Sequence, residues 1–361
     1  MNKNIYYMPF TMFIAYMDVI DLIKLTDIHP YFKKKIYNMK SFSIDISDND
    51  ETFGVLLINK FKNVILTIND CNHMTNNVKN LINLTSLNLN MNKEITDMGL
   101  KPFSNLQSLD LSCNEKITDA GLKPFTKLLS LNLFSNDKIT NQCLICLVNL
   151  QELDLTLNTQ ITNTGLSPLI NLTSLDLSHN RTITNSGLGA LHNLTKLILN
   201  TNTTITDAGV AHLQNLKSLE LYKSAITNTG LSQLVNLTEL DLGWNTTITD
   251  ECLSRLVNLT SLNISESFHH PRSLITDAGL SCLVNLKTLN LKENTKITGK
   301  GLATLVNLTE LNLTGNINIT NNDLTPLTNL KSLDVCRNYV ITQKCCISLI
   351  GRGVRLMNTI Y

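Results

Sequence analysis

Cysteine is the residue of this chain whose spacing most resembles a metal or redox site. Cys143 and Cys146 are separated by two residues, as in many zinc-binding and disulfide-exchanging pairs. A structural zinc ion needs four protein ligands, and no second cysteine or histidine pair supplies the other two. The spacing alone therefore does not predict a metal site.

The histidines lack the neighbours that catalysis requires. Five of the seven histidines lie after residue 100: His179, His192, His212, His269 and His270. None of these five has a nucleophile or a carboxylate at a recognised spacing. The chain also has no glycine-rich loop that would cradle a phosphate. We therefore expect a protein that is not an enzyme and that holds no metal and no cofactor.

The composition argues against a nucleic-acid or membrane surface. The 361 residues include 30 Lys+Arg and 29 Asp+Glu, so no net field attracts a polyanion. No apolar run approaches the length of a bilayer span, and the apolar stretch 8–17 lacks a small-residue cleavage site. The nine cysteines are odd in number and unevenly spaced, which favours reduced thiols. We expect a cytoplasmic protein that binds neither nucleic acid nor membrane.

From about residue 41 the chain repeats one line of sequence. The line LTSLDLSHNRTITNSGLGALHN starts at Leu172, and LTKLILNTNTTITDAGVAHLQN starts at Leu194, twenty-two residues later. The shared frame is L-x-x-L-x-L-x-x-N, followed by I-T and G-L-x-x-L. Its ninth position is asparagine in ten lines: Asn92, Asn114, Asn136, Asn158, Asn180, Asn202, Asn245, Asn294, Asn316 and Asn338. Ser224 and Ser267 take this position in two more lines, and two degenerate earlier lines end at Cys71 and Asn49.

This frame resembles the leucine-rich repeat family over residues 41–361. Its physical chemistry points the same way. Alternating leucines place one face of a short strand in a core, and the asparagine can hydrogen-bond the backbone of neighbouring repeats. Prolines at Pro102, Pro124, Pro168 and Pro326 keep the outer helices short. One line buries too little to fold alone, so neighbouring lines must stack.

The expected fold class is therefore α/β, a leucine-rich repeat solenoid. A parallel sheet lines its concave face and short helices form its convex face. We expect about 14 repeats of ~22 residues, plus a C-terminal cap, over residues 41–361. A small helical head is expected over residues 1–40.

Two other motifs are explained by their positions in the repeat frame. Cys143, Cys252 and Cys345 occupy its glycine position, so they are interpreted as packing residues. The glycosylation signal Asn-Leu-Thr recurs at the start of core strands, which favours a structural role. Its asparagines are Asn83, Asn171, Asn193, Asn236, Asn258 and Asn307.

The variable positions of the frame are expected to face a partner on the concave side. The fifth position is rich in acidic residues and the seventh and eighth include aromatic ones, so we expect a protein substrate with a basic patch. The candidate partner-binding residues are Phe134, Asp154, Asp176, Glu220, Tyr222, Asp241 and Trp244. One alternative stays open for the fifth position, that its Asp and Asn residues only solvate the sheet and cap local backbone. For Tyr222 and Trp244 we favour binding, because an exposed tryptophan beside an exposed tyrosine is costly without a partner.

One line is longer than the others. From Ser267 to Asn294 is twenty-seven residues, and the additional residues lie in FHHPRSL (268–274). Residues inserted into a solenoid repeat form a loop that projects from one rim. It is either a tolerated insertion or a loop that contacts the ligand.

The head does not follow the frame. It contains FIAYMD (Phe13–Asp18), DLIKL (Asp21–Leu25), Ile28 and Phe32. This spacing resembles the F-box, the helical module that recruits a cullin-type ubiquitin ligase through its small adaptor, with Phe32 in place of a tryptophan. The phrase I-T-D-x-G-L resembles F-box proteins that carry leucine-rich repeats. The resemblance implies adaptor binding by Met17, Leu22, Leu25, Ile28 and Phe32.

These observations favour the substrate-recognition subunit of a cullin-type ubiquitin ligase, which binds its substrate on the concave face. The alternative is an interaction scaffold or decoy whose helical head only caps the solenoid. A third and weaker hypothesis is an enzyme that uses a concave histidine such as His179.

Overall fold

The computed structural model describes residues 67–68, 85–267 and 273–357. The chain divides into two units, Met1–Ile161 and Thr162–Tyr361. The expected head, with Met17, Leu22, Leu25, Ile28 and Phe32, lies outside the described residues, and so do residues 268–272 of the inserted segment.

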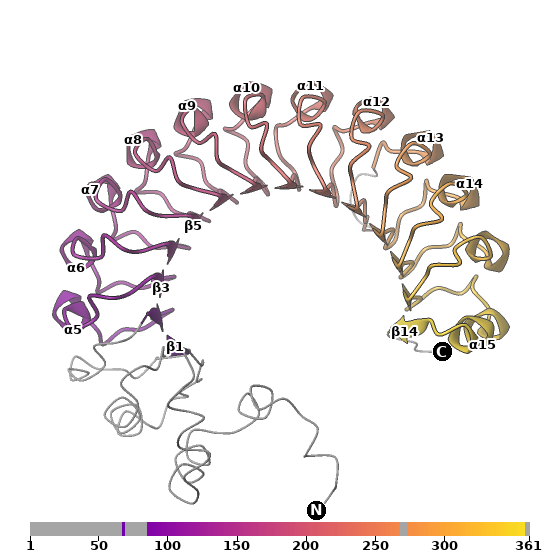
Figure 1. Ribbon diagram of the computed structural model, residues 1–361, viewed down its shortest axis with the longest axis horizontal. Helices are drawn as coiled ribbons and strands as arrows, with labels where there is room; N and C mark the ends of the chain where they lie inside the picture. The colour runs from indigo at the N-terminus through magenta and orange to yellow at the C-terminus, as the bar shows by residue number, and fades with distance from the viewer. Residues whose placement is uncertain (1–66, 69–84, 268–272, 358–361) are drawn as a thin grey trace, which may run out of the picture. The chain divides into compact units, whose positions relative to one another are not determined.

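The first unit alternates short parallel strands with single-turn helices. Its elements are β1 (Thr67–Ile68), β2 (Ser86–Asn88), α5 (Asp97–Leu100), β3 (Ser108–Asp110), α6 (Asp119–Leu122), β4 (Ser130–Asn132), α7 (Asn141–Leu144) and β5 (Glu152–Asp154). Each strand pairs with the next in chain order, and the central leucines of β2 to β5 stand in register. Within this unit the strands form one side and the helices the other (Figure 1).

The second unit continues the same alternation. Its elements are α8 (Asn163–Leu166), β6 (Ser174–Asp176), α9 (Asn185–Leu188), β7 (Lys196–Ile198), α10 (Asp207–Val210), β8 (Ser218–Glu220), α11 (Asn228–Leu231), β9 (Glu239–Asp241), α12 (Asp250–Leu253), β10 (Ser261–Asn263), α13 (Asp277–Leu280), β11 (Thr288–Asn290), α14 (Gly299–Leu302), β12 (Glu310–Asn312), η2 (Asn321–Leu324), β13 (Ser332–Asp334), α15 (Gln343–Gly351) and β14 (Arg355–Met357). The strands pair in parallel from β6 to β14. They line the inner, concave side of this unit, and the helices lie outside (Figure 1).

The leucines of the frame form the core, as the alternation predicts. In one repeat, Leu194, Leu197 and Leu199 are each 0% exposed, as are Ile205 and Leu213 on the return segment. A fully buried aliphatic side chain contributes about 1.5–3 kcal/mol. The core is shared between repeats, because each strand contacts the next one along the chain.

The ninth-position asparagines form a buried ladder, which confirms the prediction from the frame. Asn202 Nδ2 donates to the carbonyls of Leu177 and Asn180 in the preceding repeat, both at 3.0 Å. Its Oδ1 accepts from the backbone N–H groups of Thr204 and Ile205 at 3.1 and 3.0 Å. One side chain therefore ties its own loop to the neighbouring repeat, away from water. We call the set Asn92 to Asn338 named above the asparagine ladder.

A second ladder on the convex side explains the phrase I-T-D-x-G-L. Asp277, the first residue of α13, accepts hydrogen bonds from the N–H and Oγ1 of Thr298 in the next repeat, at 2.8 and 2.6 Å. A Cβ on Gly301 would lie 2.5 Å from Asp277 Oδ1, so this glycine leaves room for the aspartate. The threonine caps its own helix and also binds the preceding repeat.

The structure corrects two positions of the frame. Ser267 does not take the ladder position; Ser273, which is 2% exposed, does so and accepts from Ile275 N–H at 3.2 Å. The insertion therefore lies before the ladder position, so the frame spacing alone misplaced it. Strand β1 pairs Ile68 with Leu87, whereas a line ending at Cys71 requires Leu66 at that register position, so the line was placed two residues out of register.

Candidate partner-binding surface

The fifth-position side chains cap the backbone at the ends of the strands. Oδ1 of Asp154, Asp176 and Asp241 accepts from the backbone N–H two residues later, at 2.8 Å in each case. Asn132 does the same for Phe134 N–H at 2.9 Å. The fifth-position side chains therefore do cap local backbone, as the alternative interpretation of these residues expected. The same carboxylates remain half-exposed on the concave face, so capping does not remove them from the surface.

The two units divide the expected site residues between them. Phe134 follows β4 and Asp154 ends the neighbouring β5, both in the first unit. Asp176, Glu220, Tyr222, Asp241 and Trp244 belong to the second unit. There Glu220 and Asp241 stand side by side on β8 and β9, and Asp176 lies on β6, two strands from β8. Phe134 and Asp154 thus form a pair of their own in the first unit.

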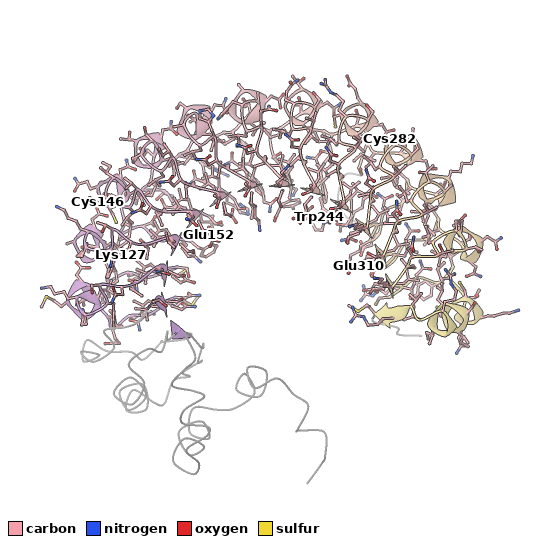
Figure 2. All side chains as sticks on the ribbon, viewed as in Figure 1. Lys127, Cys146, Glu152, Trp244, Cys282 and Glu310 are labelled. Atoms are coloured by element: carbon pink, nitrogen blue, oxygen red, sulfur yellow. The ribbon has the colours of Figure 1, made fainter. Side chains whose placement is uncertain are left out.

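Tyr222 and Trp244 form a packed pair at the ends of β8 and β9. Their ring centroids lie 5.4 Å apart with an interplanar angle of 74°, an edge-to-face contact. Nζ of Lys223 lies 5.2 Å from the centre of the Tyr222 ring. Both rings are half-buried, whereas the sequence suggests exposed ones. Figure 2 shows Trp244 on the inner side of the strands. We call Tyr222, Lys223 and Trp244 the aromatic cluster.

Asparagine side chains hold the acidic neighbours of the aromatic cluster. Asn200 Nδ2 donates to Glu220 Oε2 at 2.9 Å, and Asn200 Oδ1 accepts from Tyr222 N–H at 3.0 Å. Asn263 Nδ2 donates to Asp241 Oδ2 at 2.9 Å. Both carboxylates are therefore fixed before any partner arrives, which lowers the entropy lost on binding.

The eighth position of the frame has an unusual backbone. Its residues adopt positive φ angles of 47–62° in every described repeat except that of Glu266. They are Met91, Cys113, Ser135, Leu157, His179, Thr201, Lys223, Trp244, Glu293, Gly315 and Arg337. Glycine is the residue that tolerates this conformation without steric cost, yet it occurs once, at Gly315. A non-glycine residue there costs on the order of 1 kcal/mol. We call these residues the eighth-position row.

The side chains of the eighth-position row differ from repeat to repeat. Met91 and Leu157 are 59% and 45% exposed, and His179, Lys223 and Arg337 are exposed as well. At most positions of the row the backbone is fixed by a bond from its N–H group to the next repeat, as in Met91 to Ser112 O at 2.9 Å and Trp244 to Ser265 O at 3.0 Å. Ten different kinds of non-glycine side chain occur on this strained backbone. The backbone conformation therefore does not explain which residues stand in the row, and their exposed side chains are candidates for contact with a partner.

Sequence reasoning missed Lys223, Asn200 and Glu266. Lys223 could have been found from the sequence, because the residue type at the eighth position differs between otherwise similar repeats. Glu266, only 3% exposed, accepts from Ser273 N–H at 3.1 Å and from Thr295 N–H at 3.3 Å. It joins the two ends of the inserted segment to the next repeat. Nothing in the spacing of the sequence distinguishes this glutamate from an exposed one.

The cysteines have the properties of packing residues. Burial, with smaller contributions from Asp119 and Cys146, raises the pKa of the Cys143 thiol far above its ordinary value. Burial also raises the pKa of Cys252 to about 11. A thiol with a raised pKa is a poor nucleophile and a poor metal ligand at neutral pH. Cys146 and Cys282 lie toward the outer side of their units in Figure 2.

The described histidines do not join a cluster of candidate metal ligands. No group of three His, Cys, Asp or Glu side chains in residues 85–267 and 273–357 is arranged to hold a metal ion. His179 is an exposed member of the eighth-position row, and His192 and His212 contact each other edge-to-face at 5.2 Å. In the part of the chain that the structure describes, no helix is long and apolar enough to cross a membrane.

Comparison with known proteins supports the fold. A sequence model described as "Leucine Rich repeat" matches six segments: residues 80–104, 104–125, 146–170, 169–191, 233–257 and 283–306. A search of curated proteins found no match. The internalin InlF of Listeria monocytogenes is 25% identical, with a TM-score of 0.54 over 87% of this chain and 93% of its own.

Two further solved structures share the fold at lower identity. TLR13, solved in complex with ssRNA13, is 22% identical with a TM-score of 0.61; the match covers 92% of this chain and 51% of that one. The yeast Rad7 and Elc1 complex matches at 17% identity and a TM-score of 0.53, over 97% of this chain and 90% of that one. This chain therefore carries leucine-rich repeats and folds, in its described residues, as a leucine-rich repeat solenoid, a fold for protein interaction.

Proposed function

We propose that this chain is the substrate-recognition subunit of a cullin-type ubiquitin ligase. The concave face of the repeat region, residues 41–361, holds a protein substrate. The head, residues 1–40, binds the adaptor of the ligase. The observation that carries the substrate half is the aromatic cluster, which follows β8 and β9 on the concave face, next in sequence to two fixed carboxylates, Glu220 and Asp241.

The aromatic cluster has the chemistry of a binding hot spot. Tryptophan and tyrosine are the residues most enriched among hot spots, and packed rings lose little conformational entropy when a partner binds. Trp244 is the single tryptophan of the chain. Its half-exposed ring offers a stacking surface, and Glu220 and Asp241 favour a partner with a basic patch. Asp176, and in the first unit Phe134 and Asp154, extend the same kind of surface.

The ligase half of the proposal rests on the resemblance of residues 13–32 to an F-box. Leu22, Leu25 and Ile28 have the spacing of one apolar helix face, which suits an adaptor groove. A solved structure with this fold contains Rad7 together with Elc1. In this role the protein performs no chemistry itself. It raises the effective concentration of the substrate near the transferred ubiquitin.

The test is a pull-down from eukaryotic lysate with the full chain. Wild type is expected to capture adaptor and cullin, and Leu22→Asp/Ile28→Asp is expected to lose both. Trp244→Ala, with its head intact, serves as the matched control and should keep them. Circular dichroism checks that each variant is folded. If wild type captures neither adaptor nor cullin, the head is a cap and the protein is an interaction scaffold or decoy.

A further inference from the structure

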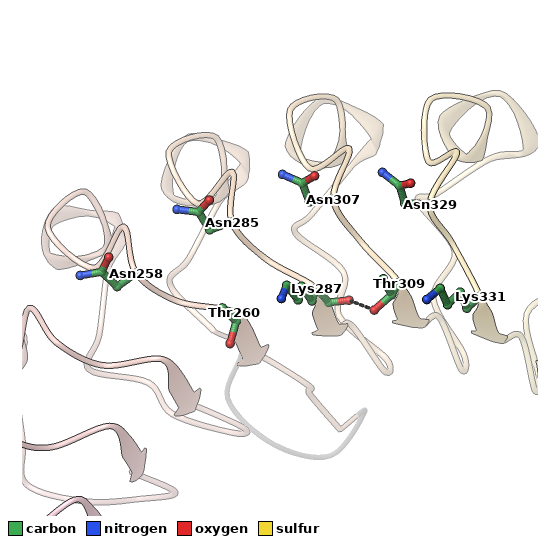
Figure 3. Close-up of a pocket in the computed structure, with 8 residues that line it drawn as sticks. All are labelled: Asn258, Thr260, Asn285, Lys287, Asn307, Thr309, Asn329 and Lys331. Atoms are coloured by element: carbon green, nitrogen blue, oxygen red, sulfur yellow. Dashed lines mark hydrogen bonds between the residues drawn. The ribbon is translucent and has the colours of Figure 1, made fainter.

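A polar hollow lies on the amino-terminal rim of the sheet in the second unit, apart from the aromatic cluster. It has a volume of about 670 Å³ and crosses the segments that lead into β10 to β13. Figure 3 shows its lining: Asn258, Thr260, Asn285, Lys287, Asn307, Thr309, Asn329 and Lys331. We call these eight residues the rim groove. No acidic side chain lines it, so its charge is positive.

The four asparagines of the rim groove use their amide nitrogens for the fold. Each Nδ2 donates to a carbonyl of the preceding repeat at 2.9–3.0 Å, the acceptors being Val235, Val257, Val284 and Val306. The Oδ1 atoms accept no hydrogen bond from residues that the structure describes. Thr309 likewise donates its hydroxyl, to the carbonyl of Lys287 at 3.1 Å (Figure 3). The groove therefore presents a row of hydrogen-bond acceptors.

The two lysines of the rim groove supply the charge. Lys287 and Lys331 are exposed and flank Thr309 on neighbouring repeats. Lys217, three repeats before Lys287, instead donates to Asn236 O at 3.3 Å. Glu310 follows Thr309 directly, but it stands on β12 and lies on the inner side of the strands in Figure 2. The cationic side of the groove is thus defined by Lys287 and Lys331.

A row of apolar side chains runs beside the asparagines. Val257, Val284 and Val306 directly precede Asn258, Asn285 and Asn307, and they are 44%, 45% and 45% exposed. Each of three consecutive repeats therefore exposes one valine next in sequence to an asparagine of the rim groove, and we call these three valines the valine strip. The same part of the unit thus carries exposed apolar side chains, a row of carbonyl acceptors and two ammonium groups.

We propose that the rim groove binds an extended peptide segment in which acidic and apolar residues alternate. In an extended chain, successive side chains point to opposite sides and the backbone N–H groups lie between them. Acidic side chains would meet Lys287 and Lys331, apolar ones would meet the valine strip, and N–H groups would donate to asparagine Oδ1 atoms. Two residues of an extended peptide span about 6.6 Å. Neighbouring repeats lie ~4.8 Å apart at their strands and about 8–10 Å apart where helices pack. A peptide that crosses the repeats at the rim, between these two distances, therefore advances by about two residues per repeat. This site is separate from the concave surface and does not depend on its proposed role.

The probe for this proposal is a fluorescein-labelled peptide of four Asp-Val pairs, titrated with the full chain by fluorescence anisotropy. We expect saturable binding that Lys287→Glu/Lys331→Glu weakens at least about tenfold, because each substitution turns an attraction into a repulsion. Val284→Ser/Val306→Ser should weaken it as well. The control Lys300→Glu/Lys344→Glu carries the same charge change on exposed convex residues and should leave binding within about twofold.

Four results would overturn the proposal. One is the absence of saturation up to about 1 mM peptide. Another is equal weakening by the convex control variant, which would indicate non-specific attraction. A third is equal binding of a Lys-Val or Asp-Gly peptide of the same length. The last is full competition by inorganic phosphate at equal concentration, which would indicate a small-anion site. Trp244→Ala should leave peptide binding unchanged, so this test is independent of the concave surface.

Discussion

The asparagine ladder and the eighth-position row are neighbours in sequence and opposites in every other respect. Asn202 is fully buried and makes the same bonds as the asparagines of other repeats. Thr201, one residue earlier, belongs to a row whose side chain changes in every repeat and whose backbone is left-handed. The ladder keeps asparagine because its amide group donates to the preceding repeat and accepts from its own loop in the same geometry each time. The row keeps different side chains although glycine would suit its backbone better.

This contrast separates residues that the fold requires from residues that we propose face a partner. Replacing a ladder residue should cost stability and leave the surface chemistry unchanged. Replacing a residue of the row with glycine should do the reverse. If the row binds a partner as proposed, stability and binding are expected to change independently, often at adjacent residues.

The largest effect is expected for Asn202→Ala. The substitution removes two bonds to Leu177 O and Asn180 O and leaves the buried N–H of Ile205 without its acceptor. Unsatisfied buried groups cost about 1–3 kcal/mol each, so we expect a loss of about 3–5 kcal/mol in the free energy of unfolding. Urea denaturation followed by circular dichroism measures it.

The control for the ladder is Asn193→Ala. Asn193 also donates to the preceding repeat, to Ile170 O at 2.9 Å, but it is exposed and water can replace the bond. We expect a loss below about 1 kcal/mol. Equal losses for Asn202→Ala and Asn193→Ala would contradict the claim that burial makes the ladder essential.

A smaller loss is expected for Gly209→Ala. A Cβ at this position would lie 2.5 Å from Asn185 Oδ1, which accepts from Thr206 N–H at 2.9 Å. The asparagine must move and its bond to the next repeat weakens, so we expect a loss of about 1–3 kcal/mol. The matched control is Gly189→Ala, whose Cβ would meet nothing closer than 3.5 Å.

Gly189→Ala should be neutral or slightly stabilising, because alanine restricts the unfolded chain. Thermal denaturation of the two variants side by side gives the comparison. If both substitutions have the same effect, the glycine of I-T-D-x-G-L is not needed for the contact between repeats.

The fold was predictable because the residues that determine it lie close together in sequence and recur in many repeats. Leucine spacing, the ninth-position asparagine and the prolines each imply one piece of geometry, and the structure confirms the strands, the ladder and the short helices. Ser273 could not be recognised, because a ladder position inside an insertion has no fixed spacing.

The surface was less predictable than the core. The sequence indicated Tyr222 and Trp244 as neighbours, but their half-burial depends on how the two rings pack on each other. The left-handed backbone of the eighth-position row carries ten kinds of non-glycine residue, so residue type does not reveal it. The partner-binding role of these residues, and the adaptor-binding role of the head, stay predictions.

The smallest expected change has the opposite sign. Thr201 is β-branched, has a φ of 56° and buries an Oγ1 that has no hydrogen-bond partner among the described residues. Thr201→Gly removes the backbone strain and the unpaired hydroxyl, so we expect a gain of about 1 kcal/mol in stability. Gly315→Ala places a side chain on the same backbone conformation, at a φ of 62°, and should cost about as much. If Thr201→Gly destabilises the protein, the eighth-position row is not under strain.

The central claim is that the aromatic cluster is the partner-binding centre of this solenoid. The most direct measurement compares partner capture by the wild-type full chain with capture by Trp244→Ala and by the convex variant Lys300→Ala. The captured partner is then purified, and its affinity for each variant is measured by titration. We expect Trp244→Ala to weaken binding by about 2 kcal/mol or more, roughly thirtyfold, while Lys300→Ala binds as wild type does. An unchanged affinity of folded Trp244→Ala would contradict the account.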